Sequence, residues 1–516
     1  MHETLKDLLV VFVISVPTFM LVKPAFSGLL TAQEFARSRN LWLALTLIVF
    51  LSHNFWLLIL LCIIAITLAQ FLDQDRVSLY FLLLLVVPPV WDKIPGLGFM
   101  DQLFTLNPKR LLELVILLPA FIALLGQEDE LPFGRSLTDK LITGYILLTL
   151  ALQIRGTTLT DTLREGFYIF LDIFLPYYVI SRSVRHAGQF RKAFSSFVIA
   201  ALLLSSSAIY EYASHHLLYS SMGHSIGANL EMSNYLMRGS SLRALATTGQ
   251  PIALGFAIMV GLGFYLFLQR HMPNASTKFL LIALLSGGLF ASLSRGPWVG
   301  MALLLLLFFW LGPNARKNMT WLMLVVFSAF ALALVLPGGE KIINLLPFIG
   351  KTDTFNVSYR ENLFTHALSV IQQNPMLGSV SFRSAPELQA MKQGEGIIDI
   401  VNSYLEVVLE YGVIGLSLFS GIFISILLGI YKTLRRFRSQ NVQRYLFGAV
   451  FYGTGELALD DEYYLLGVTL FAVLLAILLT IYTVSSITVI PTIYWAMAGM
   501  GAAYMRMNPS GANSCD

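Results

Sequence analysis

The sequence predicts an all-α, polytopic membrane protein, a bundle of about 12 to 14 transmembrane helices with a large, partly helical loop outside the membrane. Of its 516 residues, 56% are hydrophobic and only 12% are charged, and the mean hydropathy is +0.71. A soluble protein carries roughly 25% charged residues, about twice the share in this chain. Soluble enzymes and disordered scaffolds are therefore excluded. A net charge of +4 is also too small and too scattered to indicate a nucleic-acid partner.

Hydrophobic runs mark the individual spans. A bilayer core of about 30 Å needs roughly 20 apolar residues per helix. The first run lacks a small-residue cleavage site, so we expect an uncleaved first helix. The two runs around His53 form either one long helix or a broken one, and residues 444–462 are too polar to assign. Candidate spans lie near residues 8–30, 41–52, 55–71, 77–91, 111–126, 139–154, 167–181, 194–212, 251–269, 279–294, 297–311, 319–336, 411–430, 464–483 and 487–505.

Positive charge predicts the orientation, because cytoplasmic loops retain lysine and arginine. The basic clusters at 182–192, 270–278, 316–317 and 432–444 fall on one side when the spans are counted, and we expect that side to be cytoplasmic. Two long connections then face outward. The expected segments are N-terminal spans (1–212), an external loop (213–248), central spans (249–337), a large external loop with amphipathic helices (338–408) and C-terminal spans (409–516).

Two arginines precede outward-facing helix starts. Arg295 stands beside Pro297, and Arg243 precedes Pro251; we expect each proline to begin a span, because proline favours the first helical turn. Free N–H groups and the helix dipole make such a start an anion site. The alternative interpretation is that each arginine anchors its helix at the membrane interface.

A third arginine lies in the second external loop. Ser358-Tyr359-Arg360-Glu361 reads as a capping box, which would place Arg360 in the first turn of a helix. That position opposes the helix dipole, so stability does not explain it; the alternative is a solvated first-turn charge. The helix would stop at Asn374-Pro375. Its apolar stripe would contain Leu363, Phe364, Ala367, Leu368 and Ile371.

Three arginines on the outer rim indicate an anionic ligand. Guanidinium groups bind phosphate oxygens in pairs and do not lose their charge. At the headgroup boundary, the available diphosphates belong to polyprenyl-linked sugars or phospholipids, whereas a channel filter would usually present rings of like residues. We expect no metal site: His215, His216 and His224 follow no zinc spacing and suit an amphipathic surface helix. The two cysteines, Cys62 and Cys515, support no disulfide framework or metal cluster.

Several motifs together resemble the O-antigen ligase and O-antigen polymerase superfamily. Ser294-Arg295-Gly296-Pro297-Trp298 followed by an apolar helix is similar to the family signature. The large loop and the residues after it also resemble this family, at Tyr359-Arg360, Asn374-Pro375-Met376-Leu377-Gly378, Asn402-Ser403-Tyr404-Leu405 and Glu410-Tyr411-Gly412-Val413-Ile414-Gly415. The resemblance covers roughly residues 240–430.

The resemblance implies a metal-independent, inverting glycosyltransferase with a helix bundle of the GT-C type and no cofactor. Such proteins lie in the bacterial inner membrane and transfer a glycan from undecaprenyl diphosphate to an acceptor hydroxyl on the periplasmic face. Arg243, Arg295 and Arg360 match positions that bind the donor diphosphate in the family, so Arg295 and Arg360 would also take part in catalysis. A chain-length-regulating copolymerase is an expected partner.

Other polar residues have weaker assignments. Asp399 is our first choice for a general base, with helix capping as the alternative role; Glu361 is the second choice, although the capping box gives it a structural role. Positioning alone is a further alternative. Sugar hydroxyls would be bound by Tyr359, Arg383, Asn402 and Tyr404, which are also ordinary loop residues.

One departure from the family guides the choice of reaction. Ligases typically have histidine before the loop asparagine, whereas here the pair is Val401-Asn402. This favours a repeat-unit polymerase of an exopolysaccharide or O-antigen system over a ligase that transfers glycan to lipid A core or protein. A flippase for lipid-linked oligosaccharides is less favoured, because the sequence shows neither two related halves nor charges along a membrane path.

Overall fold

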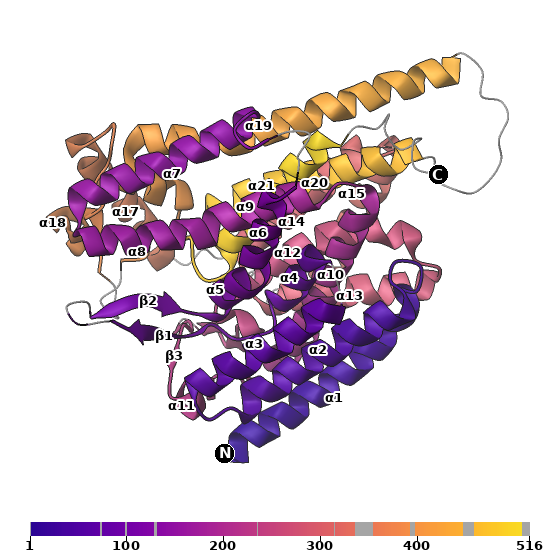
Figure 1. Cartoon of the computed structure of the whole chain (residues 1–516). Coiled ribbons are helices and arrows are strands. Elements are labelled where there is room, and N and C mark those ends of the chain that lie inside the picture. Colours follow the sequence, from indigo (N-terminus) through magenta and orange to yellow (C-terminus); the bar gives the residue numbers. More distant parts are fainter. Residues whose placement is uncertain are drawn as a thin grey trace.

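The computed structural model describes residues 2–72, 75–96, 98, 101–127, 132–234, 236–313, 315–335, 354–392, 398–446 and 459–507. This part of the chain is almost entirely helical, which confirms the all-α membrane fold (Figure 1). Seven of its helices are long and apolar enough to cross a membrane, and two shorter apolar helices, α13 and α14, accompany them. The total of about 12 to 14 spans stays a prediction, and Cys515 lies outside the described residues.

The N-terminal half begins with a helical hairpin. Asn54 separates α2 from α3, because its Oδ1 accepts the N–H groups of Trp56 (2.8 Å) and Leu57 (3.2 Å) and starts a new helix. The runs around His53 are therefore two helices. The helices of this half are α1 (His2–Ala25), α2 (Ala32–Leu51), α3 (Phe55–Leu72), α4 (Arg76–Leu83), α5 (Pro108–Leu112), α6 (Leu118–Leu125), α7 (Leu137–Gly156), α8 (Leu159–Ile169), α9 (Leu175–Ser183) and α10 (Ala187–Ser214).

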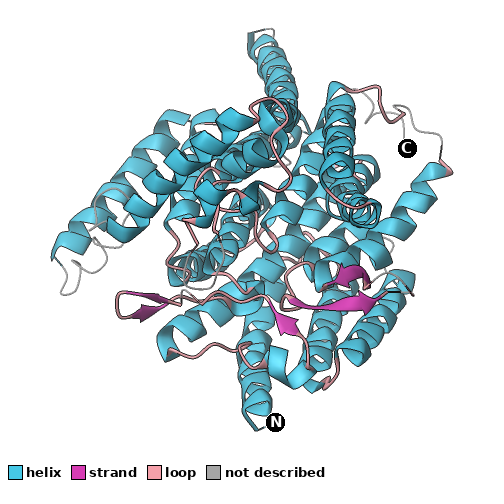
Figure 2. Ribbon diagram, turned by 90° about the vertical axis from the view of Figure 1, so that its left-hand side faces the viewer, coloured by secondary structure: helices cyan, strands magenta, loops and turns pink. Residues whose placement is uncertain are grey.

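The expected span at 77–91 is wrong. Helix α4 ends at Leu83, and the chain then enters a short sheet, because Pro88 and Pro89 cannot continue a helix. The antiparallel sheet has the order β2-β1-β3, formed by β1 (Val90–Pro95), β2 (Gln102–Leu106) and β3 (Asn229–Leu230). A second pair joins β4 (Met237–Arg238) to β5 (Ser241–Leu242). Figure 2 shows these strands gathered in one part of the molecule among the helices.

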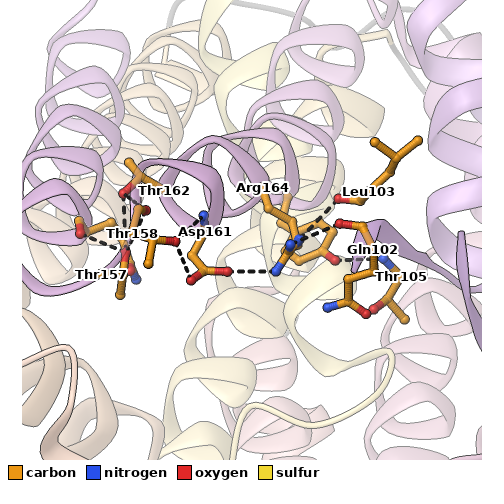
Figure 3. A network of polar contacts seen from close by, with 10 residues as sticks. Gln102, Leu103, Thr105, Thr157, Thr158, Asp161, Thr162 and Arg164 are labelled. Atoms are coloured by element: carbon orange, nitrogen blue, oxygen red, sulfur yellow. Dashed lines mark hydrogen bonds and ion pairs between the residues drawn. The ribbon is translucent and has the colours of Figure 1, made fainter. Parts of the chain in front are cut away.

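Arg164 of α8 fastens the sheet to the helices. Its guanidinium donates to the carbonyls of Leu103 (3.1 Å) and Gln102 (3.0 Å) at the start of β2, and it pairs with Asp161 at 2.8 Å (Figure 3). A charged side chain thus donates to two neighbouring carbonyls at the start of β2. The hairpin β1–β2 is held against α8 as a result.

Two π-helical segments each precede a proline. Segment η1 (Glu113–Leu117) stands before Pro119, and η2 (Phe170–Phe174) stands before Pro176. Proline has no N–H and its ring clashes with the carbonyl four residues earlier, which opens the helix locally. The carbonyl freed by Pro119 belongs to Val115, and the side chain of Gln70 donates to it at 3.0 Å. The side chain of Gln70 therefore provides the hydrogen bond that the Val115 carbonyl loses at the break.

The C-terminal half forms the centre of the bundle. Helix α12 is the most deeply buried of the seven long apolar helices in the described part of the chain, and α10 is the next. Pro251 is the first residue of α12, as predicted. The helices of this half are α11 (Met222–Ile226), α12 (Pro251–Leu268), α13 (Ala275–Ala291), α14 (Arg295–Leu311), α15 (Ala315–Val335), α17 (Thr354–Gln373), α18 (Pro386–Gln389), α19 (Ser403–Leu446), α20 (Leu459–Ile481) and α21 (Ile490–Arg506), with 3-10 turns at Ala246–Thr248, Gln269–His271 and Phe382–Ser384.

Ion pairs connect the predicted basic clusters at one end of the bundle. Glu462 at the start of α20 lies 3.2 Å from Arg191 and 3.7 Å from His271, so the connections before α10 and after α12 meet there. At the opposite end, His216 pairs with Asp7 at 2.7 Å and brings the first external loop to the N-terminus of α1. The clusters at 182–192 and 270–278 therefore share one side, as predicted.

A buried carboxylate anchors the first external loop. Glu211 of α10 accepts the N–H groups of Leu218 (3.1 Å), Leu245 (2.8 Å) and Ala246 (2.8 Å). Ala246 has a φ of 45°, a conformation that L-residues rarely adopt without such support. Both ends of the loop are thus tied to one side chain, and this fixes the path of the chain that carries Arg243.

Candidate functional site at the outer helix ends

A tight turn joins α13 to α14 and carries Arg295. Leu293 in this turn has a φ of 46°. Trp298 fixes the turn to α13, because its Nε1 donates to the Leu289 carbonyl at 3.0 Å and its ring stacks on Phe290. Arg295 is the first residue of α14, so the expectation that Pro297 begins this helix is wrong by two residues. The arginine itself occupies the helix start, where the backbone already favours anions.

The strand pair β4–β5 binds the same turn through two arginines. Arg243 Nη2 donates to Ser294 Oγ at 3.1 Å, and the N–H of Ala244 donates to the Ala291 carbonyl at 3.1 Å. Arg238 donates to the carbonyl of Leu293. The structure therefore brings Arg243 to the residue that directly precedes Arg295. Arg238 is an additional member of this group that the sequence analysis did not identify.

Burial and like charge act together on Arg243. Burial, and to a smaller extent the neighbouring charge of Arg238, together lower the pKa of the Arg243 guanidinium to about 10. The group still carries its proton at neutral pH. Two cations held close together in a partly buried place repel each other, and an anion bound between them removes that cost. This pair therefore favours a negatively charged ligand.

Arg360 reaches the site from the large external loop. Helix α17 begins at Thr354, so Ser358 lies inside the helix and Arg360 lies in its second turn; the predicted capping box is wrong. Arg360 Nη2 donates to the Thr483 carbonyl at 3.3 Å. Burial lowers the pKa of Arg360, and the nearby charge of Asp399 opposes that shift. The predicted helix end before Asn374 is confirmed.

The connection between α20 and α21, residues 482–489, joins these parts. A Cβ on Gly296 would come within 2.8 Å of the Thr483 hydroxyl, so the backbone beside Arg295 packs directly on Thr483. Thr483 is the residue whose carbonyl binds Arg360. The segments that carry Arg243, Arg295 and Arg360 therefore meet at Ser294, Gly296 and Thr483. The sequence analysis treated this connection as a short link between spans and missed it.

Asp399 is held at the same connection. Its carboxylate accepts a hydrogen bond from the hydroxyl of Ser485, and its backbone carbonyl accepts one from Tyr359 at 3.2 Å. Asn402 is the residue that caps α19, since its Oδ1 accepts the N–H groups of Tyr404 (2.9 Å) and Leu405 (3.2 Å). The capping alternative for Asp399 is therefore wrong. Its side chain is exposed to solvent near Arg360.

The predicted sugar-binding residues have structural partners. Arg383 pairs with Glu406 at 2.5 Å and donates to the Ile398 carbonyl at 3.3 Å. Tyr404 donates to the Leu478 carbonyl in α20 at 3.0 Å. Arg383 is the most accessible of these groups, with 51% of its side chain exposed. Roles for Tyr359, Arg383, Asn402 and Tyr404 in sugar binding stay predictions.

Two glycine-containing motifs lock the large loop onto α19. Gly412 interrupts this helix with a φ of 65° and a ψ of −170°, a conformation that is essentially restricted to glycine. The freed N–H groups of Val413 and Ile414 donate to the carbonyls of Pro375 (2.9 Å) and Met376 (3.2 Å). The Asn374–Gly378 motif thus accepts the backbone N–H groups at the start of the long segment of α19. Its role in the structure is to position α17.

The three histidines of the first external loop do not lie on one element. His215 ends α10 and His224 lies in the five-residue α11, so the expected amphipathic helix does not hold all three. His216 pairs with Asp7. Within the described ranges, no three His, Cys, Asp or Glu side chains group as metal ligands would.

Comparison with known proteins supports the family assignment. The family model described as O-antigen ligase matches residues 279–420, which include Arg295, Arg360 and Asp399 but neither Arg243 nor the connection at 482–489. The match confirms the resemblance to the O-antigen ligase superfamily. It supports glycan transfer of the ligase or polymerase type and a lipid-linked glycan as substrate within a membrane. A search of curated proteins gave no match.

Proposed function

We propose that this relative of the O-antigen ligase superfamily polymerises lipid-linked oligosaccharide repeat units. It would transfer a glycan from undecaprenyl diphosphate to a sugar hydroxyl of an acceptor chain, on the periplasmic face of the bacterial inner membrane, in exopolysaccharide or O-antigen synthesis. The observation that carries the proposal is the meeting of three arginine-bearing segments at Ser294, Gly296 and Thr483. The chemistry of that meeting point suits a diphosphate better than a neutral sugar.

The arginines would act on the leaving group. As the bond between the anomeric carbon and the diphosphate breaks, negative charge grows on the departing oxygen. Arg243, Arg295 and Arg360 would bind that charge, and the start of α14 would add backbone N–H groups. Each guanidinium can bind two phosphate oxygens at once, which fixes the diphosphate as well as stabilising it. Arg238, beside Arg243, would strengthen the same field.

Asp399 would act on the acceptor. In this proposal an acceptor hydroxyl attacks the anomeric carbon from the side opposite the diphosphate, which inverts the configuration. The new glycosidic bond forms as the diphosphate leaves, and the hydroxyl proton passes to the Asp399 carboxylate. The hydrogen bond from Ser485 supports this role because it orients an exposed carboxylate near Arg360. Correct positioning of the two sugars would supply much of the remaining rate enhancement, about 7–11 kcal/mol of the barrier at most.

A ligase reaction is the second candidate, and the family description favours it. The same diphosphate site would serve a single transfer of finished glycan to lipid A core or protein. Val401 precedes Asn402 where ligases typically have histidine, and this difference supports the polymerase. A chain-length-regulating copolymerase would then be the natural partner.

The test uses the full chain in nanodiscs with undecaprenyl-diphosphate-linked repeat units. A ladder of increasing glycan length indicates a polymerase, and one transfer to an added acceptor indicates a ligase. Arg295→Ala should abolish either product. Arg435→Ala, which changes an exposed arginine at the far end of α19, is the matched control and should leave the product unchanged. Equal product from both variants would contradict the proposed site.

A further inference from the structure

Helix α17 has a wide apolar surface, and the protein covers only part of it. Leu363, Ala367 and Val370 are buried in the small hydrophobic core of the external loop. Phe364 and Leu368 stay exposed by 58% and 44%. An exposed pair of large apolar side chains on a surface helix indicates a contact with an apolar partner.

This exposed stripe begins at Arg360. Residues 360, 364 and 368 are spaced by four, so their side chains lie one above another on the helix. With a rise of 1.5 Å per residue, Leu368 lies about 12 Å along the axis from Arg360. Arg360 itself reaches the Thr483 carbonyl at the candidate diphosphate site. One helix face thus combines an anion-binding group with an apolar track leading away from it.

Further exposed apolar side chains lie beyond the end of α17 and on α19. Met376, just beyond the end of α17, is 62% exposed, and its carbonyl accepts the N–H of Ile414. Val413 and Ile414 are exposed at the start of the long segment of α19, directly after the break at Gly412. Farther along that segment, Ile424 and Leu428 are exposed at the same helical spacing. Exposed apolar side chains therefore lie both on α17 and on the apolar helix that the end of the Asn374–Gly378 motif contacts.

We propose that the α17 stripe, Phe364 and Leu368 with Met376, binds the polyprenyl chain of the lipid-linked donor. This inference rests on the proposed function and extends it to the lipid part of the substrate. A polyprenyl diphosphate has an anionic head joined to a long apolar chain, and Arg360 followed by the stripe matches that order. A phospholipid also joins a phosphate to apolar chains, but its phosphodiester carries one negative charge, whereas the three arginine-bearing segments that meet here favour the higher charge of a diphosphate. A second protein copy does not account for the arginine at the head of the track.

The test compares long-chain and short-chain ligands without a glycan. Binding of undecaprenyl diphosphate and of geranyl diphosphate is measured with the purified full chain in detergent. The double variant Phe364→Ala/Leu368→Ala should bind the long-chain ligand about tenfold more weakly, because two apolar contacts are lost, and the short-chain ligand as well as wild type does. The matched control Ile64→Ala/Leu68→Ala removes a comparably exposed pair with the same spacing on α3, outside the proposed track, and should bind both ligands normally.

Other results would overturn the proposal. Equal weakening for both ligands would mean that the α17 variant only displaces Arg360. Equal weakening in the α3 control would mean that the stripe is an ordinary lipid contact. If the α17 variant does not fold, a benzophenone side chain placed at Phe364 in the otherwise native chain gives a second readout: an adduct with undecaprenyl diphosphate supports the proposal, and adducts with phospholipid or protein alone contradict it.

The same measurements separate this inference from the proposed function. Binding needs no transfer reaction. Weaker binding of only the long-chain ligand by the α17 variant, without any glycan product from the wild type, would therefore support the polyprenyl track and contradict the proposed polymerase activity. If glycan product depends on Arg295 but the α17 variant binds the long-chain ligand as well as wild type does, the proposed polymerase stands and the polyprenyl track is overturned.

Discussion

Arg360 donates a hydrogen bond to the carbonyl of Thr483 at 3.3 Å, and the side chain of Thr483 lies against Gly296, the residue that follows Arg295. One residue of the α20–α21 connection thus touches both the large external loop and the start of α14. Because the arginines themselves are long and adaptable, this backbone contact determines where their charges can meet.

Replacement of Arg295 by lysine should remove most of the activity. Lysine keeps the charge but cannot bind two phosphate oxygens with a planar fork, and loss of one preorganised donor costs about 3 kcal/mol, or roughly a hundredfold in rate. Single-turnover transfer from a lipid-linked glycan measures the effect. Arg435→Lys is the control and should behave as wild type. Near-normal polymer yield from Arg295→Lys would count against the diphosphate assignment.

Replacement of Gly412 by alanine should destabilise the fold. Its φ and ψ suit glycine only, and an added Cβ would come within 2.2 Å of the Met376 carbonyl. We expect a loss of roughly 2–4 kcal/mol in the free energy of unfolding, visible as a lower melting temperature in detergent. Gly421→Ala on the same helix is the control, since its Cβ would meet only Leu141 at 3.5 Å. Equal melting of the two variants would refute the described kink.

Removal of the Ser485 hydroxyl should slow the transfer step. Ser485→Ala leaves Asp399 without its hydrogen-bond donor, and a hydrogen bond to a charged group contributes about 1.5–3 kcal/mol, so we expect about a tenfold lower kcat with little change in the KM for the donor. Ser485→Thr retains a hydroxyl and should restore most of the rate. The control is Ser417→Ala, whose hydroxyl bonds only to its own helix in α19. Full activity of Ser485→Ala would remove the case for Asp399 as a base.

Replacement of Glu211 by glutamine should loosen the first external loop. The carboxylate accepts three backbone N–H groups, and an amide turns one acceptor into a donor that faces them. The expected loss is about 2–3 kcal/mol of stability, together with weaker donor binding, because the loop carries Arg243. Thermal unfolding and ligand binding measure the two effects. Glu3→Gln, an exposed change in α1, should alter neither.

The sequence predicted the membrane bundle well because composition and run length are local properties. Pro251 at the start of α12 and Asn374 after the end of α17 were predicted for the same reason, since both depend on the conformational limits of proline. The Ser358–Glu361 pattern misled because the helix starts farther toward the N-terminus, at Thr354, directly after Asp353, whose residue type also favours a helix start. Local rules cannot say which of two possible helix starts is used.

The missed parts of the site depend on contacts between distant residues. Thr483 and Arg360 are 123 positions apart, and Ser485 and Asp399 are 86 apart. A short polar link between two spans gives no hint of such partners. Arg238 was missed because nothing in its neighbourhood marks a helix start, and only the β4–β5 pairing turns it toward the carbonyl of Leu293.

The length of α19 has a consequence for the site. After the break at Gly412 the helix continues from Val413 to Leu446, about 50 Å, whereas the hydrocarbon layer is about 30 Å thick. In a bilayer the far end would extend beyond the hydrocarbon layer and bring exposed cations such as Lys432 and Arg435 to the headgroup layer opposite Arg360. Attraction between those cations and anionic lipids would then set the vertical position of the whole helix. The depth of Arg360 would thus depend on charges at the other surface of the membrane.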